Sequence, residues 1–385
     1  MTLKMNINKS LTRAAHCTRT MKTRHWLLFI CLATILLFKY VPSLGYFYTR
    51  CIYPVVGGLL TPISSVLPVA IGDLFIAASV AWVVVYPAYS ILLRKRKKWA
   101  TMTRVAEFLA WIYVWFYAAW GLNYSQPSIY ERIGFAPVEV SATTFRTFAY
   151  AYVDSLNATY PEGTLAACAT GVTNGYKKAV EEAVFHGYTC IDTTAGRSIG
   201  KPVHMGINAP FCRRAKAKTM VFSRLSTMAG VTGSMSPFFG EFTLNADLQP
   251  HEYASVYAHE YAHLLGVANE GEANFYSFLV CTSARDRSMR FSGYYHIFFY
   301  MLRNVRTLLG DDEYMRFTKR VRPEILRLAE HDSDYWLSRR SRLVDATQDF
   351  FYNLYLRGNK VEGGTKSYSG VTALIMAWEA AACGN

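Results

Sequence analysis

Five consecutive residues, His259-Glu260-Tyr261-Ala262-His263, carry the clearest chemical pattern in the chain. Residues four apart lie on the same face of a helix, so His259 and His263 can present two imidazoles to one metal ion. Glu260 would then lie beside the metal, where a carboxylate can act as general base toward water. The pattern therefore predicts a helix that carries a catalytic zinc site, with His259 and His263 as ligands and Glu260 as the base.

A nearly identical string eight residues earlier serves as an internal comparison. His251-Glu252-Tyr253-Ala254-Ser255 repeats the first four residue types, but Ser255 stands where the second histidine would be. A serine hydroxyl does not replace an imidazole as a zinc ligand. We therefore expect His251 and Glu252 to form the first turn of the same helix, outside the metal site.

A catalytic zinc ion needs a third protein ligand and one open coordination position. The string from Gly266 to Asn274 supplies two acidic residues, Glu270 and Glu272. Gly266 is suited to end the first helix and turn the chain back, which would bring Glu270 toward the histidines. We predict Glu270 as the ligand and keep Glu272 as the alternative. Asn274, one turn after Glu270, is expected to hydrogen bond a ligand histidine.

Two further groups of residues are candidates for a role in catalysis. Phe242, Thr243 and Leu244 lie in a β-prone run. This run is either an edge strand along which a peptide substrate pairs, or an ordinary strand packed on the active helix. Tyr294 and His296 follow a glycine and could stabilise an oxyanion, although the aromatic residues around them favour packing in the core.

The elements that must position these residues are mostly helical by their apolar spacing. The pattern predicts helices over the ranges 141–156, 163–186, 251–265, 270–284 and 311–356. Between Thr219 and Leu244, short β-prone runs separated by Gly and Ser predict a small sheet. The expected fold class is mainly α, with N-terminal transmembrane helices followed by an α+β domain that holds a small β-sheet.

The first quarter of the chain has the composition of a membrane domain. Three apolar stretches predict transmembrane helices over 26–41, 74–93 and 105–122, and the broken apolar segment from Ile52 to Pro68 is expected at the interface. Basic residues precede the first stretch and fill the loop from Arg94 to Arg104. By the positive-inside rule both segments are cytoplasmic, and the chain after the third stretch lies outside. If the first stretch is instead a cleaved signal peptide, the same part lies outside.

The distribution of charge argues against a nucleic-acid-binding role. Residues 1–104 carry fourteen Lys or Arg and one acidic residue, whereas the remaining 281 residues carry 27 basic and 26 acidic groups. The larger part of the chain is therefore nearly neutral and predicts no surface for nucleic acid. Six of the eight cysteines would lie outside the membrane, where disulfides form, but their spacing predicts neither a pairing nor a cysteine zinc site.

The HEYAH string and the string after it resemble zincin metallopeptidases of the gluzincin type, whose third zinc ligand is a glutamate. The seven residues from His263 to Glu270 make the spacing shorter than in thermolysin-like enzymes. The chain also resembles the membrane-anchored domain-of-unknown-function 3810 family, from about residue 30 to the C-terminus. The strings that carry this second resemblance are Trp120–Tyr124, Pro237–Glu241, His259–His263, Glu270–Phe275 and Ser292–Tyr294. Together the resemblances imply membrane spans followed by a zincin-like domain.

These features together predict a zinc-dependent metallopeptidase anchored in the plasma membrane, with Zn²⁺ as cofactor and a peptide or protein as substrate. The expected domains are a membrane domain over 1–124 and an extracytoplasmic metallopeptidase domain over 125–385. A second hypothesis is a non-catalytic, metal-containing sensor or scaffold domain. It is disfavoured because a structural zinc usually has four protein ligands and the sequence shows no fourth. A site inside the membrane is disfavoured by the three glutamates within thirteen residues, Glu260, Glu270 and Glu272.

Overall fold

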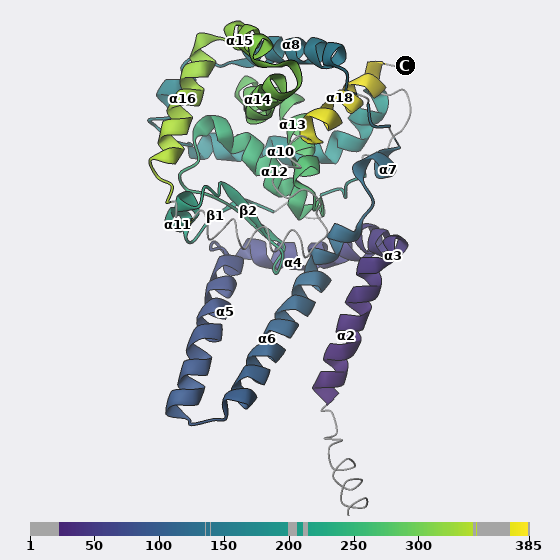
Figure 1. The fold of residues 1–385 in the computed structure, drawn as a ribbon, viewed down its shortest axis with the longest axis vertical. Helices are drawn as coiled ribbons and strands as arrows, with labels where there is room; N and C mark the ends of the chain where they lie inside the picture. Colours follow the sequence, from purple (N-terminus) through teal and green to yellow (C-terminus); the bar gives the residue numbers. More distant parts are fainter. Residues whose placement is uncertain are drawn as a thin grey trace, which may run out of the picture.

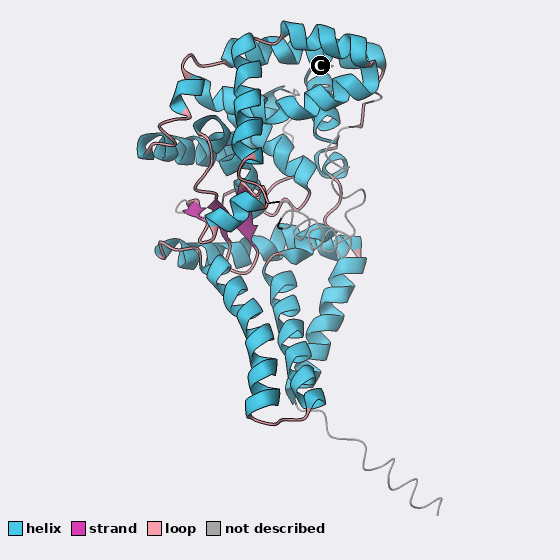
Figure 2. Ribbon diagram, turned by 60° about the vertical axis from the view of Figure 1, so that its left-hand side comes forward, coloured by secondary structure: helices cyan, strands magenta, loops and turns pink. Residues whose placement is uncertain are grey.

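The computed structural model of the chain describes residues 23–134, 136–138, 140–198, 206–210, 215–341, 344 and 370–383. Three long helices extend from one side of a larger helical body, and a small sheet lies where the two parts meet (Figure 1). A second view shows the same division, with the strands at the level of the helices that cross the ends of the long ones (Figure 2). The prediction of a mainly helical fold with a small sheet is confirmed.

The long helices are α2, α5 and α6; shorter elements next to the body connect α2 to α5, whereas α5 and α6 are joined at their far ends (Figure 1). In chain order the elements of this part are α2 (Thr23–Tyr40), α3 (Pro42–Phe47), the π-helical turn η1 (Tyr48–Ile52), α4 (Tyr53–Val66), α5 (Ile71–Ala88), the π-helical turn η2 (Tyr89–Leu93), α6 (Lys98–Ala119) and the 3-10 turn η3 (Gly121–Ser125). Within the described residues, Thr23–Tyr40 and Ile71–Leu93 are long and apolar enough to cross a membrane.

These two helices correspond to the first two predicted spans, and their apolar side chains face outward, with 6% of each segment buried. Helix α6 contains most of the third predicted span but does not reach the same apolarity, so its crossing stays a prediction. Five of the six basic residues before the first span fall in residues 1–22, outside the described part of the chain, and the sixth, Arg24, pairs with Glu107 of α6 at 3.0 Å.

Helix α4 contains most of the segment predicted to lie at the interface. It runs across the ends of α5 and α6 instead of beside them (Figure 1). Three of its exposed side chains, Val55, Leu59 and Ile63, recur every four residues and therefore form an apolar stripe on one face. A helix with such a stripe is suited to lie flat at the surface of a membrane.

The body contains α7 (Ile129–Ile133), α8 (Ala142–Thr159), α9 (Thr164–Ala167), α10 (Asn174–Ser198), α11 (Ser223–Met228), α12 (Pro250–Leu264), α13 (Glu270–Thr282), α14 (Arg287–Leu309), α15 (Asp311–Arg320), α16 (Pro323–Leu337) and α18 (Gly370–Cys383). The predicted helix 163–186 is two helices, α9 and α10. The predicted helix 311–356 is divided before Pro323, because the residue preceding a proline disfavours the helical conformation. Most of its residues beyond 341 lie outside the described part.

The sheet contains β1 (Lys218–Thr219), β2 (Gly233–Ser236) and β3 (Glu241–Leu244) in the order β1-β3-β2. Strand β1 is parallel to β3, with Thr219 opposite Leu244, and β2 is antiparallel to β3, with Gly233 opposite Leu244. Of the two alternatives for Phe242, Thr243 and Leu244, the substrate-binding edge is excluded because β3 is the central strand, and the strand packed on the active helix is what the structure has. The edge strand closest to α12 along the chain and in space is β2.

Helix α12 lies at the centre of the body, in contact with the sheet and with α10, α13 and α14 (Figure 1). The phenyl ring of Phe242 on β3 packs edge-on against Tyr257 and Tyr261, at centroid distances of 5.1 and 5.8 Å. The hydroxyl of Tyr188 on α10 donates to the carbonyl of Ala258 at 2.7 Å. Aromatic packing on several sides thus holds α12 rigidly.

A buried ion pair ties the sheet to the start of α5. Glu241 accepts hydrogen bonds from Lys218 Nζ and from the backbone N–H of Gly72, each at 2.5 Å. Gly72 lies in the first turn of α5, where a carboxylate is favoured by the helix dipole. Asp73 accepts from the backbone N–H of Val221 at 2.9 Å. The body and the long helices are therefore joined by a buried ion pair and by an exposed hydrogen bond, not only by the chain.

The described cysteines carry free thiols, namely Cys31, Cys51, Cys168, Cys190 and Cys281. Cys17, Cys212 and Cys383 are not among the residues whose side chains are described. No disulfide joins two of the described residues, so packing and hydrogen bonds hold this part of the body together.

Candidate metal centre

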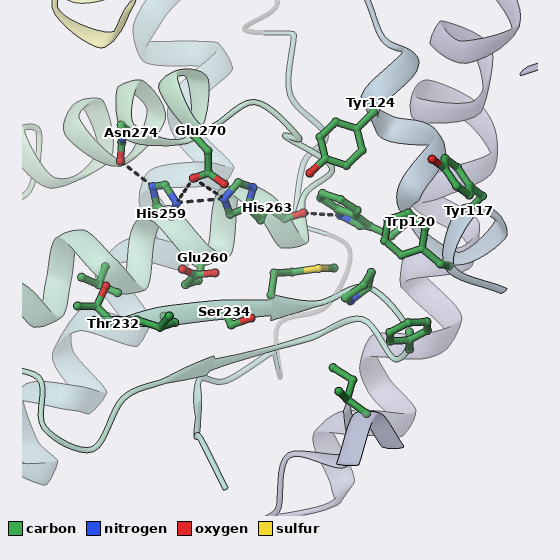
Figure 3. A pocket seen from close by; sticks show the side chains of 18 of the residues that line it. Tyr117, Trp120, Tyr124, Thr232, Ser234, His259, Glu260, His263, Glu270 and Asn274 are labelled. Carbon is green, nitrogen blue, oxygen red and sulfur yellow. Dashed lines mark hydrogen bonds and ion pairs between the residues drawn. The ribbon is translucent and has the colours of Figure 1, made fainter. Parts of the chain in front are cut away.

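Three donor atoms converge between α12 and α13 (Figure 3). His259 Nε2 and His263 Nε2 are 3.0 Å apart. Glu270 Oε2 lies 3.2 Å from the first nitrogen and 3.5 Å from the second. The structure therefore brings together the three residues that the sequence predicts as metal ligands.

The turn between the two helices explains how Glu270 reaches the histidines. Gly266 ends α12 with φ of +95°, and a Cβ there would lie 3.0 Å from the ring of Tyr53, so both backbone and space require glycine. The chain then enters α13 at Asn269, whose side chain accepts from the backbone N–H of Glu272 at 3.1 Å. Glu270 is consequently the first residue of α13 and faces the histidine-bearing side of α12.

The second nitrogen of each histidine is held by a hydrogen-bond acceptor. His259 Nδ1 donates to Asn274 Oδ1 at 2.7 Å, and His263 Nδ1 donates to the carbonyl of Val267 at 2.6 Å. A neutral imidazole that is protonated on Nδ1 has its lone pair on Nε2. When both imidazoles are neutral, their Nε2 lone pairs therefore point toward the shared space beside Glu270, as metal ligation requires.

Asn274 links this centre to α14. Its Oδ1 also accepts from His296 Nε2 at 2.8 Å, and its Nδ2 donates to the hydroxyl of Tyr300 at 3.3 Å. Burial, aided by the nearby His259, lowers the pKa of His296 to about 3, so this imidazole is neutral. His296 thus lies in the wall of the centre and orients Asn274; its Nε2 is committed to that contact.

Tyr294 is not at the centre. Its ring packs edge-on against Phe278 and Tyr152, at 5.3 and 5.6 Å, in the hydrophobic core between α8 and α14. On α14, positions 294 and 296 point in different directions because successive helical residues are rotated by about 100°. Of the two alternatives for Tyr294, packing in the core is therefore confirmed and the oxyanion role is excluded.

The two acidic candidates for the third ligand are separated in the structure. Glu272 forms a buried ion pair with Arg132 of α7 and accepts from the backbone N–H of Ile129 at 3.1 Å. Arg132 is 1% exposed, so this pair is removed from water. Glu270, not Glu272, lies among the histidines, and Glu272 fastens α13 to α7.

The charges within the centre are strongly coupled. Burial disfavours the ionised form of Glu270, but the two histidines outweigh it and hold the pKa of its carboxyl well below the usual range. Burial likewise opposes protonation of His263, yet the carboxylates of Glu270 and Glu260 raise its pKa to about 9. A carboxylate placed against two imidazoles is the charge pattern that attracts a divalent cation.

Glu260 lies beside the histidines and against the edge strand. Burial raises the pKa of its carboxyl, although His259 and His263 oppose the shift. A Cβ at Gly233 of β2 would lie 2.5 Å from Glu260 Oε1, so only glycine leaves room for this carboxylate. Figure 3 shows Glu260 between the histidines and β2. A raised pKa next to a cluster of imidazoles is typical of a group that exchanges protons.

The carbonyls at the end of α12 are bound by side chains from distant parts of the chain. Trp120 Nε1 donates to the carbonyl of His263 at 2.8 Å, and the hydroxyl of Tyr53 donates to that of Leu264 at 2.5 Å. Gln126 Nε2 donates to the carbonyl of Gly266 at 2.9 Å. The His263 carbonyl also accepts from the backbone N–H of Gly266 at 3.0 Å, so the three side chains add to the turn in fixing the end of α12 that carries His263.

A cavity of about 1050 Å³ opens at the centre. Its wall includes the donors, Glu260 and several residues that sequence reasoning missed, among them Tyr124, Thr232 and Ser234. Figure 3 shows the hydroxyl of Tyr124 directed toward the space beside His263 and Glu270. Tyr124 ends the string Trp120–Tyr124, which was the sequence signal for this contribution.

Comparisons with known proteins give one match. The model of a family described as a protein of unknown function (DUF3810) matches residues 48–376, which include α4 to α6, the sheet and all residues of the centre. No curated protein and no solved structure matches the chain. The matched region covers most of the 385 residues, so the chain belongs to the DUF3810 family.

Proposed function

We propose that the chain is a membrane-anchored, zinc-dependent metallopeptidase, and that His259, His263 and Glu270 hold the zinc ion. The observation that carries the proposal is the size of the donor triangle, with sides of 3.0, 3.2 and 3.5 Å. Donors around a tetrahedral zinc are about 3.3 Å apart, because each bond is about 2.0–2.2 Å long. Two histidines and a glutamate are also a donor set of catalytic zinc, which leaves a position open for substrate.

A zinc ion bound there would supply a Lewis acid for the substrate carbonyl and ease the deprotonation of water. The chain itself supplies the proton transfers. A carboxylate oxygen of Glu260 takes a proton from the attacking water, whose oxygen bonds to the carbonyl carbon. When the C–N bond breaks, Glu260 returns the proton to the leaving nitrogen, so the reaction consumes one water. The hydroxyl of Tyr124 donates a hydrogen bond to the oxyanion that develops on the carbonyl.

Strand β2 is proposed to align the peptide. The N–H of Asn245, just after β3, donates to the carbonyl of Thr232, just before β2. On the opposite edge of β3, the N–H of Met220 donates to the carbonyl of Leu244. Because antiparallel pairs alternate between bonded and non-bonded, Gly233 and Met235 direct their backbone groups away from β3. A peptide that pairs with these groups would pass beside Glu260, which contacts Gly233.

The location follows from the long helices. We propose that α2, α5 and α6 cross the plasma membrane, that the N-terminus is cytoplasmic and that the zincin-like body is extracytoplasmic. Support comes from the two apolar helices and from the basic residues at the ends of α5 and α6 that point away from the body.

The chain offers a matched pair of variants that tests the hydrolytic mechanism. Glu260→Gln and Glu252→Gln make the same change in the two HEYA strings, and Glu252 instead accepts from Trp336 Nε1 at 3.0 Å, away from the centre. The full-length protein in detergent is incubated with a mixed peptide pool, and products are identified by mass spectrometry. We expect Glu260→Gln to keep its zinc and to lose about 10²–10⁴-fold in hydrolysis, while Glu252→Gln cleaves as the wild type does. Full hydrolysis by Glu260→Gln would refute the assigned mechanism.

A further inference from the structure

The cavity at the metal centre continues along the long helices. Besides the donors and Glu260, its wall includes Ile76 on α5 and Leu109, Ile112 and Phe116 on α6. The loop between β2 and β3 closes it on one side, where Phe238 packs against Phe75 at 5.0 Å. One continuous space thus joins a candidate catalytic site to helices that are proposed to lie in the membrane.

The lining positions on α6 show how far this space extends. They are Leu109, Ile112, Tyr113, Phe116 and Tyr117, followed by Trp120 just after the helix. Spacings of three and four residues place them on one face of the helix. From Leu109 to Trp120 the helix rises by ~16 Å, which is about half of the ~30 Å hydrocarbon core of a membrane.

The walls change in character along this length. Ile76, Leu109 and Ile112 make the deep arm apolar. Near the body, Lys39 Nζ donates to the hydroxyl of Tyr117 at 2.9 Å and lies 4.9 Å from the centre of its ring. Lysine and tyrosine are residues that mark the level of lipid headgroups. The wall of the cavity is therefore apolar at the end far from the body, carries Lys39 and Tyr117 at the level expected for lipid headgroups, and reaches the candidate metal centre inside the body.

We infer, on the basis of the proposed peptidase, that the substrate is a peptide that carries a lipid chain. The acyl chain lies in the arm between α5 and α6, and the peptide next to it lies along β2, with its amide at the metal centre.

Photocrosslinking tests the inference without requiring cleavage. The full-length protein in lipid nanodiscs is exposed to an alanine-serine hexapeptide whose N-terminal palmitoyl chain carries a diazirine at its midpoint. Two further probes serve as comparisons. The first is a phosphatidylcholine with the same photoreactive acyl chain, which tests whether any membrane lipid fills the arm. The second is the same hexapeptide with an N-terminal acetyl group and a diazirine-bearing side chain, which tests whether the peptide alone binds there. Labelled residues are located by mass spectrometry. We expect the palmitoyl peptide to label residues 109–116 of α6 at least fivefold more than either other probe at equal concentration.

Two variants of α5 give the matched control. Ile76 and Leu74 are 47% and 46% exposed and lie at the same depth, but only Ile76 is in the wall of the cavity. They are two residues apart and so point to opposite sides of the helix. Ile76→Trp should fill the arm and reduce labelling at least fivefold, whereas Leu74→Trp should not change it. If Ile76→Trp does not fold, Leu109→Trp makes the same test from α6.

The possible outcomes separate this inference from the proposed function. Equal labelling by the phospholipid, or labelling that is unchanged in both Ile76→Trp and Leu109→Trp, would overturn the inference even if peptides are cleaved. Selective labelling together with no hydrolysis of any peptide would uphold the acyl-binding arm and contradict the peptidase.

Discussion

Removing the hydrogen-bond acceptor of Asn274 should weaken zinc binding without removing a ligand. Asn274→Leu keeps the size of the side chain but leaves two buried donors, His259 Nδ1 and His296 Nε2, without the oxygen that lies 2.7 and 2.8 Å away. His259 then loses the contact that fixes its tautomer and ring orientation. Loss of such a partner typically reduces metal affinity 10–100-fold, which corresponds to about 1.4–2.7 kcal/mol.

The assay is a competition titration of the full-length protein in detergent against a chromophoric zinc chelator, with thermal unfolding measured in parallel. Asn274→Asp keeps an acceptor at the same place, so its zinc affinity should equal or exceed that of the wild type. Tyr300→Phe removes the 3.3 Å contact to Asn274 Nδ2 but keeps both contacts of Asn274 Oδ1, and should change the affinity by less than about threefold. A folded Asn274→Leu variant that binds zinc as tightly as the wild type would refute the role given to Asn274.

Two further predictions concern the edge strand and the buried histidine of the first turn of α12. Gly233→Ala places a Cβ 2.5 Å from Glu260 Oε1 and should lower peptide hydrolysis at least tenfold with zinc retained. The control Gly175→Ala adds a Cβ in open space on α10 and should leave hydrolysis unchanged. Equal hydrolysis by the two variants would contradict the placement of Glu260. Burial opposes protonation of His251, but Asp332, 2.7 Å away, raises its pKa to about 9. The pair of charges therefore stabilises the fold fully below ~pH 6.5, and this stabilisation is lost progressively as the pH rises through 9. Denaturant unfolding of the wild type and Asp332→Asn should therefore differ more at about pH 6 than at about pH 10, and a difference independent of pH would show that His251 is not charged.

Local rules were sufficient to predict the residues of the centre. The four-residue spacing of His259 and His263 needs only a helix, and a glycine followed by an N-cap residue and a second helix brings Glu270 back to the first. The choice between Glu270 and Glu272 was open in the sequence because it depends on Arg132, which is 140 positions away from Glu272 along the chain. A contact of that separation leaves no local signal.

The same reason explains why the sequence left two alternatives open for Phe242–Leu244 and for Tyr294. Phe242–Leu244 has the β-prone composition of a strand, but its central position results from parallel pairing with the distant Lys218–Thr219. Tyr294 and His296 are two positions apart, and which of them faces the centre depends on how α14 packs against α8 and α13. Local sequence indicated the elements, whereas the partners of each element were decided by packing.

The support of α12 by Trp120, Tyr53 and Gln126 was likewise not predicted, although Trp120 belongs to a string that carried the family resemblance. Its physical role is to donate hydrogen bonds to carbonyls at and just after the end of α12. Because Trp120 and Tyr53 lie before residue 125, a protein cut at the predicted domain boundary would lack these contacts. The experiments therefore use the full-length chain.

The metal content of the full-length protein tests the central claim most directly. It would be purified in detergent without chelators, supplied with zinc, desalted and measured by inductively coupled plasma mass spectrometry. We predict about one zinc ion per chain in the wild type and in Glu272→Gln, and a loss of at least 80% in His259→Ala and Glu270→Gln. A wild-type protein that holds no zinc, or a Glu270→Gln variant that holds as much as the wild type, would contradict the assignment of His259, His263 and Glu270 as a zinc site.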